Sequence, residues 1–174
     1  MKTEEAVTKL EAQYADAISH KRIFHDQTTL EITKANLKRV LSFFKDAGYE
    51  VLMDLSAVDY IEPEKHTLVV YFLHDPTNYE RVRISLSAAR DEVIPSVTDL
   101  WAGAAWYERE VYDLFGVNFE GHPDMKRLLM PDDWIGHPLR KDYALTEVPV
   151  QFKNGVRPKV PSEIIPHVKS YSKP

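Results

Sequence analysis

The sequence predicts an α+β fold, in which a small mixed or antiparallel sheet of about four strands is covered by helices and followed by an extended, proline-rich C-terminal arm. Three observations predict this fold. Helical spacing of apolar residues occurs in the first fifty residues and again after residue 95, strand-like patterns lie between them, and 8 of the 11 prolines fall after residue 115. We therefore expect a globular body over residues 1–115 and an arm over residues 116–174.

The first elements follow from the spacing of apolar side chains. Residues 7–18 carry them at steps of three and four, which predicts a helix that ends near His20. Alternation over residues 29–32 predicts a short, half-buried strand. Residues 37–44 return to helical spacing, and Gly48 supplies the left-handed residue that commonly ends a helix.

The middle of the chain predicts three strands. Residues 49–55 form the first, and residues 68–73 and 81–86 flank a turn-rich stretch at 74–78, which is typical of a hairpin. Because residues 68–73 are apolar throughout, we expect them at the centre of the sheet.

The region after Pro95 predicts helix, because proline suits the first helical turn. Gly103 interrupts this helix, and a further helix ends at Gly116. Arg109 and Asp113 are four residues apart on it, so we expect them to pair along a surface that presents its charges outward.

Composition excludes several classes of function. The chain has 174 residues, no cysteine and a formal net charge of −5. Without cysteine it has no disulfide, no thiolate nucleophile and no cluster held in the usual all-cysteine way. Nucleic acid is not expected as a partner, because phosphate binding relies on concentrated Lys and Arg. No apolar run approaches the roughly 20 residues of a membrane-spanning helix, and the N-terminus lacks the pattern of a signal peptide.

The densest group of chemically active side chains lies between residues 106 and 143. Five of them can transfer protons or bind ions: Glu108, Glu110, Asp113, His122 and His137. A catalytic or metal site is one interpretation. Their spacing favours the other, hydrogen-bonded structural residues, because it contains no His-Glu-x-x-His pair, no Gly-x-Ser-x-Gly turn and no phosphate-binding glycine loop. We therefore predict no catalytic, cofactor-binding or metal-binding residue.

The stretch from Pro138 to Tyr143 has two interpretations on its chemistry alone. It is either a charged surface loop or a set of interface anchors. Arg140 offers a planar fork of donors, Asp142 an acceptor, and Leu139 and Tyr143 offer apolar area, as interface anchors do.

Five short motifs follow one another in this part of the chain. They are Glu108-Arg109-Glu110, Asp113-Leu114-Phe115-Gly116, His122-Pro123, Lys126-Arg127-Leu128-Leu129 and Pro138-Leu139-Arg140-Lys141-Asp142-Tyr143. In order and spacing they resemble the signature of the 30 kDa subunit family of respiratory NADH:quinone oxidoreductase, complex I. The resemblance is dense over residues 106–143, and the body before it agrees in length and order.

The resemblance implies a structural subunit of the hydrophilic arm, with no cofactor of its own. Flavin and iron–sulfur clusters are expected in partner subunits, and the quinone only indirectly, through the complex. The expected partners are the 49 kDa-type large subunit, which helps enclose the quinone pocket, and neighbouring iron–sulfur subunits. The expected location is the cytoplasmic side of the cell inner membrane, as a peripheral part of the complex. Related scaffold subunits of membrane-bound hydrogenases or of ferredoxin-fed quinone reductases are the alternative.

The concentrated charge and the apolar anchors of the helix at 104–115 and of residues 122–143 lead us to expect that these two segments form the contact with the large partner. The residues predicted to form this interface are Glu108, Arg109, Glu110, Asp113, His122, Arg127, Leu139, Arg140, Lys141, Asp142 and Tyr143. We expect the proline-rich residues 144–174 to become ordered only on assembly.

Overall fold

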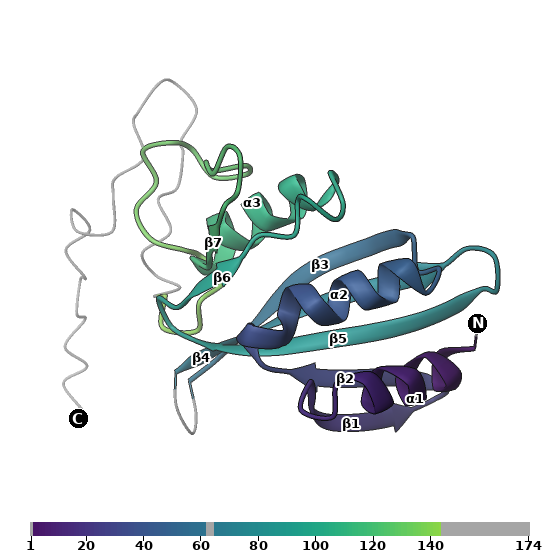
Figure 1. The fold of residues 1–174 in the computed structure, drawn as a ribbon. Helices are drawn as coiled ribbons and strands as arrows, with labels where there is room; N and C mark the ends of the chain where they lie inside the picture. The colour runs from purple at the N-terminus through teal and green to yellow at the C-terminus, as the bar shows by residue number, and fades with distance from the viewer. Residues whose placement is uncertain (1, 62–64, 144–174) are drawn as a thin grey trace, which may run out of the picture.

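A five-stranded sheet forms the centre of the computed structural model, which describes residues 2–61 and 65–143 (Figure 1). The strands are β1 (Ile18–Phe24), β2 (Gln27–Ile32), β3 (Val51–Tyr60), β4 (His66–Asp75) and β5 (Glu80–Ala89). Their order across the sheet is β1-β2-β5-β4-β3. Only the β2–β5 pair is parallel, and the other neighbours are antiparallel. The predicted α+β fold with a mixed sheet is confirmed.

Two helices, α1 (Thr3–Gln13) and α2 (Leu37–Asp46), pack their apolar sides against one face of the sheet and form the core with it. A short 3₁₀ turn, η1 (Lys34–Asn36), leads into α2. Leu10 of α1 and Phe44 of α2 are fully buried in the same core as Ile84 of β5. Burying a side chain of this size stabilises a fold by about 1.5–3 kcal/mol. Along the strands, alternate residues face this core, because successive side chains of a strand point to opposite faces of the sheet.

The helix α2 and the β4–β5 hairpin agree with the sequence predictions. Gly48 follows α2 with φ of 105°, a conformation that residues with a Cβ rarely adopt. The hairpin pairs Leu73 with Val82 and Val69 with Leu86, and β4 has a neighbour on each side, as its apolar sequence predicted.

The predicted end of the first helix was wrong. Helix α1 stops at Gln13, and residues 18–24 form the edge strand β1 instead. This strand has no alternation of buried and exposed positions, because only Ile18 is partly buried and the other six residues are exposed. A sheet-edge strand with so little burial carries no period-two signal, so no local pattern indicated a fifth strand.

The helix predicted after Pro95 was also wrong. Pro95 ends the strand β6 (Val93–Pro95), which pairs in parallel with β7 (Asn118–Glu120). The long helix α3 (Ala104–Phe115) starts only after Gly103 and ends at Gly116, as predicted. Proline at the end of a short strand costs little, because few ladder hydrogen bonds depend on its missing N–H.

Strand β7 lies within the predicted arm but pairs with a strand of the predicted body, and its Phe119 is buried. The division at residue 115 stays a prediction, and residues 144–174 lie outside the described part of the chain. Helix α3 packs against β3, where the Tyr107 hydroxyl donates to the Met53 carbonyl at 3.1 Å. Within the described ranges, no helix is both long and apolar enough to cross a membrane.

Candidate functional site

The candidate site is α3 together with residues 121–143, which loop beside it (Figure 1). At its centre lies the side chain of Asp113, which is fully buried. Its Oδ2 accepts three backbone N–H groups, from Leu128 at 3.0 Å, Leu129 at 2.7 Å and Met130 at 2.8 Å. Its Oδ1 accepts from Arg127 Nη1 at 2.7 Å. One carboxylate thus fixes the backbone of the whole turn.

The pKa of Asp113 is lowered by this arrangement. Burial by itself raises the pKa of the carboxyl, but the Met130 N–H, the Arg127 guanidinium and the remaining N–H groups together outweigh burial. The carboxylate is therefore the stable form at neutral pH, and it serves as a structural acceptor.

Arg127 also connects this network to residues 134–136. Its Nη2 donates to the carbonyls of Trp134 at 2.8 Å and Gly136 at 3.1 Å. Arg109 on α3 in turn donates to the backbone carbonyls of Lys126 at 3.1 Å and Arg127 at 2.8 Å. The expected Arg109–Asp113 pair is therefore wrong. The side chain of Asp113 lies in the interior, where Arg127 reaches it from a distant part of the chain.

Residues 137–140 complete the C-terminus of α3. The last carbonyls of a helix have no partner within the helix. Here His137 Nδ1 donates to the Asp113 carbonyl at 2.9 Å, and the Leu139 N–H donates to that of Leu114 at 3.0 Å. Arg140 donates from Nε to Phe115 at 2.6 Å and from Nη2 to the carbonyl that follows, at 3.2 Å. A positive side chain here also suits the negative end of the helix dipole.

Gly116 makes this capping possible. Its φ is 76°, and a Cβ at this position would collide with the guanidinium of Arg140 and the ring of His137. Glycine is therefore required at position 116 for two reasons, the positive φ and the closeness of the capping side chains.

A second set of polar contacts joins residues 141 and 142 to the sheet. The buried carboxylate of Asp59 on β3 accepts the Lys141 N–H at 2.7 Å and Arg90 Nη2 at 2.6 Å. Arg90 also pairs with Asp142, which Lys65 approaches at 3.3 Å. Sequence reasoning missed Asp59 and Arg90, because nothing local marks a pair of residues that are 31 positions apart.

Glu108 is the other fully buried acid of α3. Its Oε1 accepts the Val97 N–H at 2.7 Å, so it holds the turn that precedes the helix. Burial raises the pKa of this carboxyl, which favours its neutral form. The expectation that α3 presents its charges outward is thus wrong for Glu108 and Asp113, both of which serve as internal acceptors.

His122 forms hydrogen bonds through both ring nitrogens. Its Nδ1 accepts the Asp124 N–H at 3.0 Å, so the neutral ring has its proton on Nε2, which lies 3.1 Å from the Ala105 carbonyl. Both His122 and His137 are thus hydrogen-bonded to backbone groups, and the interpretation of the two as structural residues stays a prediction.

Apolar side chains take the outward positions instead. The exposed fractions are 60% for Trp106, 61% for Leu129, 52% for Ile135 and 49% for Leu139. Each is carried by α3 or by backbone that the Asp113, Arg127 and Arg140 contacts hold. A set of exposed apolar side chains on a fixed backbone is typical of a protein–protein contact.

Comparison with known proteins identifies the family of this chain. The family model described as "Respiratory-chain NADH dehydrogenase, 30 Kd subunit" matches residues 30–149. The chain belongs to this family. Its relatives include the C subunit of the NADH-quinone oxidoreductase of Citrifermentans bemidjiense, 42% identical over 80% of this chain and 88% of that protein. The corresponding protein of Geobacter sulfurreducens is 41% identical, again over 80% of this chain and 88% of that one.

Solved structures share the fold of this family member. A trypsin-resistant fragment of Nqo5, residues 1–134, matches with a TM-score of 0.63 and 29% identity, over 71% of this chain and 99% of the fragment. A chain of an archaeal membrane-bound sulfane sulfur reductase matches with a TM-score of 0.73 and 25% identity, over 82% of this chain and 85% of that chain. The family is thus one of subunits of respiratory oxidoreductase complexes.

The predicted interface residues fall into three groups. Glu108 and Asp113 are buried. The partly buried ones are Arg109, His122, Arg127, Arg140 and Tyr143, and the exposed ones are Glu110, Leu139, Lys141 and Asp142. Contact of any of them with a partner stays a prediction. Trp106, Leu129 and Ile135 were absent from the predicted set, although large apolar side chains in or beside a charged motif are a usable signal.

Proposed function

We propose that this chain is a cofactor-free structural subunit in the hydrophilic arm of an NADH:quinone oxidoreductase, where it braces the large, 49 kDa-type subunit of the quinone site. One observation carries the proposal. Three charged side chains of the family motif, those of Asp113, Arg127 and Arg140, point inward and fix residues 127–140. Leu129, Ile135 and Leu139 are left exposed on that backbone. A surface fixed before binding loses little entropy on association, which suits a brace.

The cofactor-free part of the proposal is supported by composition. The chain contains no cysteine, the residue that holds most iron–sulfur clusters. The side chains of Glu108, Asp113 and Arg140 in the motif are hydrogen-bonded to backbone groups of this chain. In this proposal electrons pass through neighbouring subunits, and this chain supplies the fixed geometry.

The proposed location is peripheral, on the cytoplasmic side of the cell inner membrane and attached through the complex. Membership of a respiratory family supports the membrane association. Neighbouring iron–sulfur subunits complete the proposed set of partners, and the quinone is reached only through the large subunit.

The test replaces Leu129 and Ile135 by Arg in the full chain, expressed in place of the natural copy. We expect the purified variant to have the same free energy of unfolding as the natural chain, since both side chains are exposed. We also expect it to be depleted from the membrane complex, with loss of NADH:quinone reductase activity. The matched control is Tyr79→Arg. Tyr79 is 83% exposed and lies on the β4–β5 turn, at the other end of these strands from the Arg90–Asp142 contact. A complex of normal stoichiometry and activity from the double variant would refute the proposal.

A second candidate is the same scaffold role in a complex with another electron donor or acceptor. The match to the sulfane sulfur reductase chain favours keeping it, because that chain shares the fold with a TM-score of 0.73 over 82% of this chain. Membrane-bound hydrogenases and ferredoxin-fed quinone reductases belong to this alternative. Purification of the complex with its subunits decides: an NADH-binding flavoprotein subunit supports the first proposal, and its absence supports the second.

A further inference from the structure

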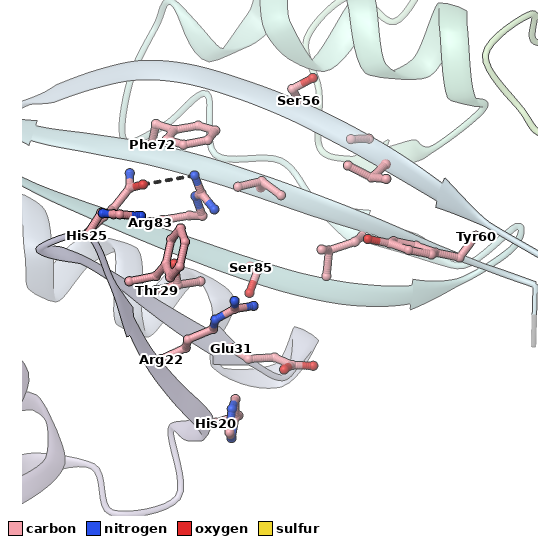
Figure 2. Close-up of a pocket in the computed structure, with 16 residues that line it drawn as sticks. His20, Arg22, His25, Thr29, Glu31, Ser56, Tyr60, Phe72, Arg83 and Ser85 are labelled. Carbon is pink, nitrogen blue, oxygen red and sulfur yellow. Dashed lines mark hydrogen bonds between the residues drawn. The ribbon is translucent and has the colours of Figure 1, made fainter. Parts of the chain in front are cut away.

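The face of the sheet that points away from α1 and α2 holds a hollow of about 960 Å³ (Figure 2). All five strands contribute to it. Its central strands supply an apolar floor, with Leu68, Val70 and Phe72 on β4. These residues alternate with Val69, Tyr71 and Leu73, which face the helices and are buried in the core. The hollow is therefore the second face of the same sheet, with no described helix over it.

Apolar area remains exposed around this floor. Val58 and Tyr60 on β3 are each 42% exposed, and Phe24 on β1 is 61% exposed. Contiguous apolar area on a folded protein usually marks a contact surface, because leaving it in water is unfavourable.

The rim of the hollow is basic, although the chain has a net charge of −5. Arg22, Arg83, His20 and His25 line it, with Glu31 as the only acid among its lining residues. Cross-strand register places Arg22 opposite Thr29, and Thr29 opposite Arg83, so the two arginines occupy one row across the sheet.

The two arginines of this row are positioned but not neutralised. Arg83 Nη2 donates to Gln27 Oε1 at 3.1 Å, as Figure 2 shows, and its guanidinium lies 4.9 Å from the Phe72 ring centre. Arg22 lies 5.5 Å from the ring centre of Phe24. Among residues 2–61 and 65–143, neither arginine has a carboxylate within 4.0 Å, whereas Arg90 and Arg127 both do. Within the described part of this acidic protein, the two arginines thus lack counterions.

We propose that this face binds an acidic, partly apolar segment of another subunit, whose carboxylates pair with Arg22 and Arg83 and whose apolar side chains fill the hollow over Leu68 and Val70. Charge complementarity selects this occupant. A second copy bound through the same face would bring arginines against arginines, at an electrostatic cost. The chain's own residues 144–174 carry five Lys and Arg but two Glu, so they have the wrong sign.

This contact is separate from the proposed brace, because no residue that lines the hollow belongs to residues 104–143. It holds for either of the two complexes discussed above. The chain would then bind partners through two surfaces, one around α3 and one on the sheet.

The experiment places a photo-crosslinking amino acid at Ser56, an exposed residue of the hollow on β3, in the full chain assembled in its membrane complex. We expect cross-links to an Asp- or Glu-containing segment of another subunit, identified by mass spectrometry. The double variant Arg22→Glu/Arg83→Glu is expected to lower their yield about tenfold or more. Lys21→Glu is the matched control, because Lys21 is the neighbour of Arg22, does not line the hollow, and should leave the yield unchanged.

Charge exchange completes the test. Replacing the acids of the cross-linked segment by Arg is expected to restore the yield with the double variant. If the double variant does not enter the complex, Arg22→Ala replaces it, and a fall of about threefold is expected. Cross-links to residues 144–174, to a second copy, or to no protein in an intact complex would each overturn the proposal, as would failure of the charge exchange.

Discussion

Arg127 donates from Nη1 to Oδ1 of Asp113 at 2.7 Å, and this pair joins the last turn of α3 to the loop that follows β7. The side chain of Asp113 is fully buried and that of Arg127 is 14% exposed. Because all four hydrogen bonds to the carboxylate oxygens come from residues 127–130, the pair determines where the exposed Leu129 stands.

Asp113→Ala is expected to destabilise the chain by about 3–5 kcal/mol, the usual cost of removing one partner of a buried ion pair. Arg127 would lose its counterion, and three backbone N–H groups would lose their acceptor. Urea unfolding of the purified chain measures the loss, and hydrogen exchange should show faster exchange at Leu128, Leu129 and Met130.

The matched control for this change is Asp124→Ala. Asp124 also pairs with a cation, Lys126, but both side chains are largely exposed to water. We expect no measurable change in stability from it. Equal effects at the two positions would contradict the structural role assigned to Asp113.

Arg140→Ala is expected to loosen the C-terminus of α3. Two helix-end carbonyls lose a charged donor, at a cost of about 1.5–3 kcal/mol. Thermal unfolding together with hydrogen exchange in the last turn of α3 checks this. Lys141→Ala is the natural comparison, because Lys141 uses its backbone N–H rather than its side chain to hold Asp59. If the two variants unfold alike, Arg140 is not the cap.

Gly116→Ala is expected to strain the same helix end. A positive φ in a residue with a Cβ costs about 1–3 kcal/mol, and the collision with Arg140 adds to it. Gly103 has φ of −64° and open space around it, so Gly103→Ala should change stability by less than about 1 kcal/mol. Urea unfolding of both variants compares them, and a greater loss at Gly103 would contradict the geometry.

The sequence predicted the parts of the fold whose signals are local. The spacing in α2, the apolar run of β4 and the stop at Gly116 each depend on neighbours within a few residues. Strand β1 escaped prediction because it is exposed on both faces, and Pro95 was misread because proline also suits a strand end.

The candidate site was located by sequence but its orientation was not. The motif between residues 108 and 143 marked the segment that contains this hydrogen-bond network, yet the spacing of Arg109 and Asp113 suggested a surface pair. The actual partner of Asp113 is fourteen residues away, beyond a strand and a turn. A pattern of three and four residues describes contacts along one helix and carries no information about a loop that folds back over it.

His137 is expected to make the stability of the chain depend on pH. Burial lowers the pKa of its imidazole below the ordinary 6.5, and the nearby Arg140 and Arg127 lower it further, against the effect of its bond to the Asp113 carbonyl. The unfolded chain therefore takes up this proton at a higher pH than the folded chain does. The stabilisation is complete above about pH 6.5 and is lost as pH falls through the folded-state pKa.

The measurement is the free energy of unfolding in urea between pH 5 and pH 8. We expect it to fall with decreasing pH below about 6.5 in the natural chain, and to fall less steeply in His137→Gln, which keeps a donor near the Asp113 carbonyl without taking up a proton. His20→Gln on the exposed strand β1 is the matched control, because it removes an imidazole without touching α3. If His137→Gln and the natural chain show the same slope, then protonation of His137 does not limit the stability of the α3 cap.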